Sequence, residues 1–316
     1  METIHQRHQR VGLIPVMLLA AGMTAASPAG ELPDGRAVIR GPAGGSEIVI
    51  TTTPRLAGVI DSLTWNGKEF IDSADHGRQL QSASNLDAGI QSIAAETYNP
   101  TEAGSVNDGA GNTSSSQLLH MVAGPSFLQT TSRMAFWLAP GGTSAGHPAR
   151  NTTVLSHHVL TKRVTIGHPG LPQVIPYQVT FSLPLGEHHT EAVFEALTGY
   201  MPAEFSQFHQ YVAATRKLEP LSDGPGEQAN PVVLAVPGGT HAMGIFAPRQ
   251  PGAHTSGPSY GRFRFDDAKV VKWNCVFRVR NPAGVAPGEY VYQMFVVVGD
   301  LVMVRDALAA LHRTVP

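Results

Sequence analysis

The chain has 316 residues and a formal net charge of −2, with 22 Lys and Arg against 24 Asp and Glu. Without a cluster of basic residues it lacks the track of positive charge that nucleic-acid binding needs, so we expect no nucleic-acid partner. Cys275 is the only cysteine, so no disulfide can form within the chain. The length is normal for one large β-sandwich, whose stability must come from its buried core.

Residues 1–26 are typical of a secretory signal peptide. Arg7 and Arg10 precede an almost wholly apolar run at 11–26, VGLIPVMLLAAGMTAA, which is too short for a comfortable membrane span. Thr24-Ala25-Ala26 supplies the small residues that signal peptidase cleavage requires. We expect residues 27–316 to remain as a single β-sandwich domain, periplasmic or secreted, with no membrane span after cleavage.

Glycine and proline, with 33 and 24 occurrences, leave little room for long helices and favour short strands separated by turns. The clearest local signal is residues 61–71, DSLTWNGKEFI, in which Asn66-Gly67 lies between two short runs that contain apolar residues. Asn-Gly readily adopts the positive φ angles of a type I′ turn, so this segment is predicted to be a β-hairpin. Strands are also predicted at residues 46–53, 117–122, 128–138, 154–166, 174–183, 191–197, 232–236, 242–246, 259–265, 269–280 and 289–298.

The best-patterned pair of strands lies near the end of the chain. Polar residues alternate there with apolar ones, which predicts a buried face made of Val271, Trp273, Cys275, Phe277 and Val279. Residues 290–298, YVYQMFVVV, are apolar on both faces, as in a central strand. Only residues 300–313 have the spacing of an amphipathic helix. We therefore predict an all-β fold, a large antiparallel β-sandwich of two sheets with a short C-terminal helix.

The segment GVIDSLTWNGKEFID, followed by DHGRQLQ, resembles the start of the galactose-mutarotase-like β-supersandwich proteins. The matching residues are Gly58, Ile60, Ser62, Leu63, Asn66, Gly67, Lys68, Glu69, Asp75, Gly77 and Arg78. The ending GEYVYQMFVVVGDLVMVRDAL is similar to the family's last strand and C-terminal helix. The resemblance implies a sheet whose concave face meets carbohydrate, in a fold that serves epimerases, lyases and domains of glycoside hydrolases. The local signatures of the mutarotases' catalytic histidine and glutamate are absent, so those roles are not placed on numbered residues.

Residues 75–108 hold many polar and few apolar side chains, which predicts a long surface segment that carries the site. Glu102 is the first candidate for a catalytic acid, since Pro100 stiffens its approach and Ala103-Gly104 leaves room for a ligand. The alternative is a carboxylate that only orders its loop. A glycosidase also needs a second carboxylate. The further catalytic candidates are Asp75, Glu96, Asp108 and His76.

Candidate substrate-binding residues combine amides, rings and a cation. Glutamine binds paired sugar hydroxyls because its amide donates and accepts at once, and aromatic rings stack on the C–H faces of sugars. Arg78 could bind a uronate carboxylate, or pair with Asp75 as a structural ion pair. The full set is Arg78, Gln79, Gln81, Tyr98, Asn99, His120, Tyr200 and His209.

The spacing of the 14 histidines does not predict a metal site. The pairs His157-His158 and His188-His189 fall in or beside predicted strands, where adjacent side chains face opposite ways and cannot easily bind the same ion. We therefore expect no metal and no cofactor. The predicted function is that of an exported carbohydrate-active enzyme that acts on an oligosaccharide or polysaccharide with glycoside-hydrolase-type acid/base chemistry. The alternatives are a non-catalytic glycan-binding or envelope-glycan protein, and a sugar epimerase or polysaccharide lyase.

Overall fold

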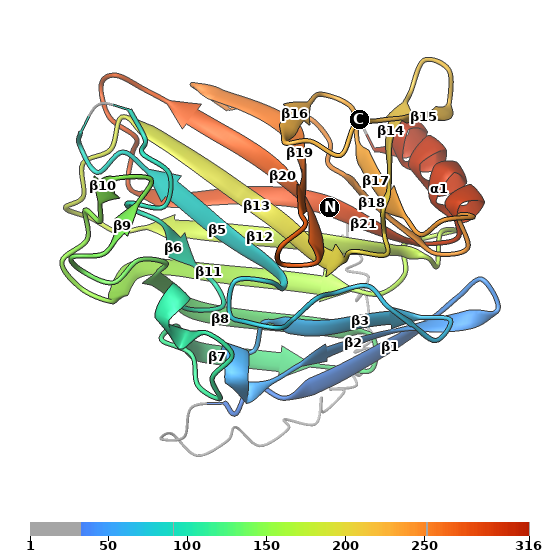
Figure 1. Ribbon diagram of the computed structural model, residues 1–316, viewed down its shortest axis with the longest axis horizontal. Helices are drawn as coiled ribbons and strands as arrows, with labels where there is room; N and C mark the ends of the chain where they lie inside the picture. Colours follow the sequence, from blue (N-terminus) through green and yellow to red (C-terminus); the bar gives the residue numbers. More distant parts are fainter. Residues whose placement is uncertain (1–32, 91, 251, 316) are drawn as a thin grey trace, which may run out of the picture. The chain divides into compact units, whose positions relative to one another are not determined.

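The computed structural model describes residues 33–90, 92–250 and 252–315, which belong to one compact unit. The predicted signal peptide, residues 1–26, lies outside the described residues. Within them, 19 strands are connected in one antiparallel hydrogen-bonded network, and the one α-helix is α1 (Leu301–Thr314) (Figure 1). No helix in these ranges is both long and apolar enough to cross a membrane.

The network consists of two sheets that are joined by one short strand. Sheet A contains, in order of pairing, β1 (Ala37–Ala43), β2 (Ser46–Thr52), β3 (Ile60–Trp65), β5 (Leu80–Leu86), β13 (Glu191–Pro202), β20 (Val270–Arg280), β19 (Thr255–Phe265) and β16 (Gly226–Gln228). Strand β4 (Lys68–Glu69) is paired with β3.

Sheet B contains β7 (Gln117–Ala123), β8 (Phe127–Phe136), β11 (Leu155–Thr165), β12 (Val174–Leu183), β21 (Gly288–Gly299), β18 (Ala242–Phe246), β17 (Val232–Ala235), β14 (Gln207–Val212) and β15 (Lys217–Pro220). Strand β6 (Pro100–Thr101) pairs with β5 of sheet A and with β8 of sheet B. A separate hairpin is formed by β9 (Thr143–Ser144) and β10 (His147–Pro148), and short 3-10 turns are η1 (Pro54–Leu56) and η2 (Val106–Asp108). The predicted all-β sandwich of two antiparallel sheets is confirmed.

The core lies between the two sheets, because each strand turns alternate side chains inward. Strand β20 follows this rule as predicted: Trp273 and Phe277 are fully buried, and Phe277 stacks on Tyr292 of β21 with ring centroids 4.3 Å apart. Helix α1 covers a further apolar face, and its buried residues Val304 and Leu308 pack with β18 and β21. The predicted C-terminal helix is thus confirmed, with Asp300 capping its N-terminus by accepting from the Met303 N–H.

The Asn66-Gly67 hairpin is also confirmed. Asn66 and Gly67 have φ angles of 49° and 74°, and they join β3 to β4. The Glu69 carboxylate accepts hydrogen bonds from the backbone N–H groups of Leu63, Phe70 and Ile71, so it holds the end of the hairpin together.

One segment that was expected to be a surface loop contains a strand. Within residues 75–108 lies β5, a strand of sheet A, whose inward positions include the small hydroxyl residues Ser82 and Ser84 instead of large apolar ones. The sequence of β5 therefore lacks the alternation of apolar and polar residues by which a half-buried strand is usually predicted. The candidate binding residue Tyr200 lies in β13.

Candidate functional site

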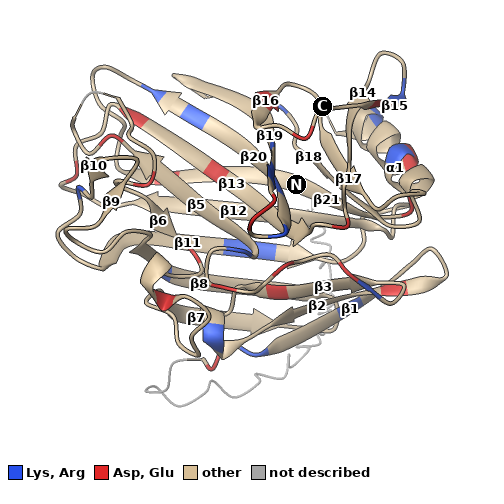
Figure 2. Cartoon of the chain, in the orientation of Figure 1, with Lys and Arg blue, Asp and Glu red and all other residues tan. Residues whose placement is uncertain are grey.

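An open pocket of about 480 Å³ lies on the outer face of sheet A, opposite the core. Its floor is built by β5, β13, β20, β19 and β16, and β13 and β20 both carry charged residues (Figure 2). A volume of this size falls in the usual range for small-molecule and cofactor sites. The floor residues are Gln81, Ala83, Asn85, Val193, Glu195, Thr198, Tyr200, Glu227, Phe263, Lys272, Asn274 and Arg278, and the rim includes Gly77, Ile93, Ala95, Glu96, Asn99, Thr101 and Trp137.

A β-bulge in β13 brings two of these residues together. The register of β13 against both β5 and β20 shifts after Glu195, so Ala196 is an extra residue in the strand. Because of that extra residue, Glu195 and Thr198 both face the pocket although they are three positions apart. The Thr198 hydroxyl donates to the Glu195 carboxylate at 2.9 Å, and Ser82 Oγ donates to the Ala196 carbonyl at 2.8 Å.

Glu195 and Lys272 form the central ion pair of the pocket. Lys272 Nζ lies 3.1 Å from Glu195 Oε2, and the side chains are 13% and 21% exposed for Lys272 and Glu195, respectively. Burial alone would raise the pKa of the Glu195 carboxyl, but the Lys272 ammonium and the hydrogen bonds from Lys272, Thr198 and Asn274 outweigh it and lower that pKa. Glu195 is therefore a carboxylate at neutral pH, suited to accepting hydrogen bonds from sugar hydroxyls.

Aromatic rings and a second ion pair surround this centre. Lys272 Nζ lies 5.1 Å from the ring centroid of Tyr200 and 5.2 Å from that of Phe263, distances at which a cation is attracted to a ring face. Arg278 donates to both oxygens of Glu227, at 2.7 and 2.8 Å. The pocket thus offers paired charges, amides, hydroxyls and ring faces within one open surface.

Four of the predicted site residues line this pocket: Gln81, Glu96, Asn99 and Tyr200. Gln81 and Asn99 are mostly buried, and each also bonds the backbone, Gln81 accepting from the Ala103 N–H and Asn99 donating to the Ser84 carbonyl. Glu96 lies in an exposed rim loop and accepts a hydrogen bond from Ser144 at 2.7 Å.

Glu102 does not line the pocket. It follows Thr101, which does, and neighbours in extended chain point to opposite sides, so the Glu102 side chain lies in the core. Its Oε1 accepts from Lys162 Nζ of β11 at 2.6 Å, and its Oε2 accepts from the Ser82 N–H at 3.1 Å. With side chains 0% and 1% exposed, Lys162 and Glu102 form a buried ion pair between the sheets. This position suits a structural role.

Most of the other predicted residues order the loops beside the pocket. Asp75 pairs with Arg78 at 3.0 Å, the structural alternative noted above, and Gln79 is fully buried and donates to Ser73 at 3.0 Å. His76 is buried, with its two ring nitrogens 2.7 and 2.9 Å from the Gly109 and Arg55 carbonyl oxygens. Asp108 closes a capping box with Ser105 at the start of η2.

Three predicted binding residues lie elsewhere. His120 is exposed on β7 of sheet B, and His209 lies in β14 of that sheet, where burial lowers its pKa. Tyr98 packs against Phe136, with ring centroids 4.7 Å apart, and against His158 and His189.

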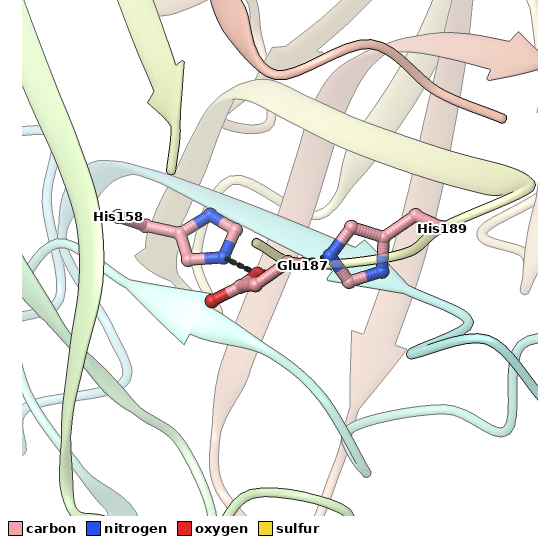
Figure 3. Close-up of side chains that lie close together, drawn as sticks. All are labelled: His158, Glu187 and His189. Carbon is pink, nitrogen blue, oxygen red and sulfur yellow. Dashed lines mark hydrogen bonds and ion pairs between the residues drawn. The ribbon is translucent and has the colours of Figure 1, made fainter. Parts of the chain in front are cut away.

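His158, Glu187 and His189 form a cluster that was not predicted from the sequence. Neighbours do face opposite ways, since His157 and His188 are exposed while His158 and His189 are buried. Yet one buried histidine from each pair reaches the same carboxylate. His158 Nε2 and His189 Nε2 lie 2.7 and 2.9 Å from Glu187 Oε2, one ring on either side of it (Figure 3).

No family model and no curated protein matches this chain. Similar solved structures include a protein from Synechocystis sp. PCC 6803, at 9% identity and a TM-score of 0.41, covering 87% of this chain and 100% of that one. An alpha-galactosidase from Lactobacillus brevis has 12% identity and a TM-score of 0.43, over 85% of this chain and 40% of that one. An alpha-mannosidase from Enterococcus faecalis has 10% identity and a TM-score of 0.47, over 91% of this chain and 32% of that one. Likenesses this remote carry no functional argument.

Proposed function

We propose that this protein is an exported carbohydrate-active enzyme that binds an oligosaccharide or polysaccharide in the sheet A pocket. The observation that supports the proposal is the lining of that pocket. Amides such as Gln81 and Asn274 can bind hydroxyl pairs, and the rings of Tyr200 and Phe263 offer stacking faces beside them. The pocket is open, as a site for an extended chain must be.

The proposed chemistry is centred on Glu195. A carboxylate that stays ionised beside Lys272 serves as a base or a nucleophile, and not as a proton donor. Glycoside hydrolysis also needs a carboxylic acid on the other side of the scissile bond. Glu227 is bound to Arg278, so we assign the acid position to Glu96 of the rim loop.

Elimination or epimerisation is the second candidate reaction. It needs a base to take a proton from a carbon atom and a cation to stabilise the negative charge that results. Glu195 and Lys272 lie side by side in the pocket and would supply both. A non-catalytic glycan-binding protein would use the same lining without turnover.

A glycan panel with detection of products by mass tests the proposal. Hydrolysis adds water to the products, elimination leaves an unsaturated sugar, and pure binding gives affinity without products. Glu195→Gln should lower turnover by roughly 10²–10⁴, the usual contribution of an acid–base group. Glu191→Gln is the matched control, because Glu191 lies on the same strand, pairs with Arg280 and does not line the pocket. Failure of every glycan to bind would overturn the proposal.

Export is tested separately from the chemistry. The mature protein isolated from its natural source should begin after residue 26. Native protein that retained residues 1–26 would contradict the export part of the proposal alone.

A further inference from the structure

The His158–Glu187–His189 cluster combines side chains from two parts of the sandwich. His158 lies on β11 of sheet B, and Glu187 and His189 lie in the connection from β12 of sheet B to β13 of sheet A. One nitrogen from each histidine and one carboxylate oxygen lie within 4.8 Å of one another. No part of the proposed carbohydrate chemistry uses these residues.

The ligand types and their spacing suit a zinc ion. Zinc binds histidine nitrogen at about 2.0–2.1 Å and carboxylate oxygen at about 2.0–2.2 Å, which leaves tetrahedral ligand atoms roughly 3.3 Å apart. The two nitrogens lie 2.7 and 2.9 Å from Glu187 Oε2, so shifts of well under 1 Å would open the cluster around an ion. Imidazole also favours zinc over magnesium or calcium, which prefer oxygen ligands.

The surroundings of His189 fix the orientation of its ring. A histidine that binds metal through one nitrogen usually donates its other N–H to a carboxylate or carbonyl group. His189 Nδ1 accepts the Ala88 N–H at 3.2 Å and lies 3.5 Å from Oδ1 of the buried Asp87, which is fixed by the Thr190 N–H and hydroxyl. An ion at Nε2 would put the proton of the ring on Nδ1, where the Asp87 carboxylate is placed to accept it. This arrangement presents Nε2 of His189 to the centre of the cluster.

His158 is the other buried ring of the cluster. The residue is 1% exposed, and its Nδ1 is buried without a hydrogen-bond partner among the described residues. The His158 ring thus makes one hydrogen bond within the described residues, to the Glu187 carboxylate. The one polar contact of its ring is therefore made through Nε2, the atom that would bind the ion.

The cluster can be reached from solvent. Glu187 and His189 line an open pocket of about 610 Å³, and the Glu187 side chain is 21% exposed, against 1% and 3% for His158 and His189. An ion could therefore enter past the carboxylate, and a water molecule could take the fourth position.

We propose that His158, Glu187 and His189 bind one zinc ion, which cross-links sheet B to the connection that leads into sheet A. The chain has a single cysteine, so it cannot place a disulfide at this position. The proposed ion would supply the cross-link that a disulfide provides in other exported proteins.

The test is zinc binding to the full chain after treatment with a chelator. Calorimetry should give one equivalent of Zn²⁺, with Mg²⁺ and Ca²⁺ giving no heat at this site. Zinc at about 100 times its dissociation constant should raise the unfolding midpoint by roughly 5 °C or more. Absence of zinc binding, or an unchanged midpoint with zinc in excess, would overturn the proposal.

Variants locate the ion. His189→Gln and Glu187→Gln should each weaken zinc binding by roughly 100-fold or more, because each removes one of three ligands. His188→Gln is the matched control, since His188 is adjacent but exposed, and it should bind zinc as the wild type does. Unchanged binding by His189→Gln and Glu187→Gln would place the ion elsewhere and refute the site.

A crystal of the wild-type protein soaked in zinc keeps the proposal testable if the variants do not fold. Anomalous scattering at the zinc edge should show its peak between the two imidazole rings, about 2.0–2.1 Å from each Nε2. A peak found only at another position would refute the site.

Discussion

Glu195 owes its ionised state to a balance between burial and a neighbouring cation. Burial favours the neutral acid, whereas Lys272 and the hydrogen bonds to the carboxylate favour the anion. The second effect is the larger one, so the pKa of Glu195 is lowered. A residue with this environment holds a negative charge in a pocket that is otherwise lined by amides, hydroxyls and rings. The pair is therefore the site's strongest feature for orienting a polar ligand.

The lowered pKa of Glu195 predicts how stability changes with acid. Because the folded-state pKa lies below the usual value of 4.5, the pair contributes its full stability above about pH 4.5. That contribution should be lost as the pH falls from 4.5 through the folded-state pKa. Urea denaturation midpoints measured across this range should fall more steeply for the wild type than for Glu195→Gln. Parallel pH profiles of the two proteins would show that the pair adds no stability.

At the scale of single strands, the close approach of β13 to β20 depends on one glycine. Gly199 lies opposite Trp273, and a Cβ atom at Gly199 would lie 2.4 Å from two atoms of the Trp273 ring. Real Cβ atoms do not approach so closely, so a larger residue must displace a fully buried tryptophan.

We therefore predict that Gly199→Ala destabilises the fold by about 1–3 kcal/mol, the usual cost of overpacking a core. Denaturation with urea measures the change. In a Trp273→Leu background the same substitution should cost much less, because the ring it meets is gone. An equal cost in both backgrounds would show that the backbone, and not the ring, resists the added methyl group.

Strands differ in how far their sequences predict them. The alternation in β20 predicts its buried residues, and it also marks Lys272, Asn274 and Arg278 as the outward row that now lines the pocket. Strand β5 gives no such signal, because serine occupies two of its inward positions. The bulge at Ala196 has no sequence signature, so the meeting of Glu195 with Thr198 could be learned only from the structure.

For the molecule as a whole, the class of fold and the C-terminal helix follow from local patterns, while the site depends on contacts between distant segments. The cluster at Glu187 illustrates this, since His158 lies 29 residues away from it in sequence. Residues 75–108 were predicted to carry the site, and three of them, Gln81, Glu96 and Asn99, line the sheet A pocket. The direction in which each side chain points was not predictable there, and Glu102 points into the core.

The Glu102–Lys162 pair connects the two sheets through the core, and its removal should be costly. Glu102→Gln would leave the Lys162 ammonium buried without a charged partner, so we predict a loss of about 3–5 kcal/mol in unfolding free energy. The double variant Glu102→Gln with Lys162→Met removes both charges and should recover much of that loss. Chemical denaturation of the three proteins measures this. Normal stability of Glu102→Gln together with lost turnover would restore Glu102 as a catalytic candidate.

Sheet A presents one face to the core and the opposite face to the pocket, and successive residues of a strand alternate between them. On β20, Trp273 faces the core, while its neighbours Lys272 and Asn274 face the pocket. Mutation can therefore exchange the pocket-facing residues while the packing beneath them is kept. A fold built in this way can diversify its ligand preference quickly over evolutionary time, so homologues with the same core can have different specificities.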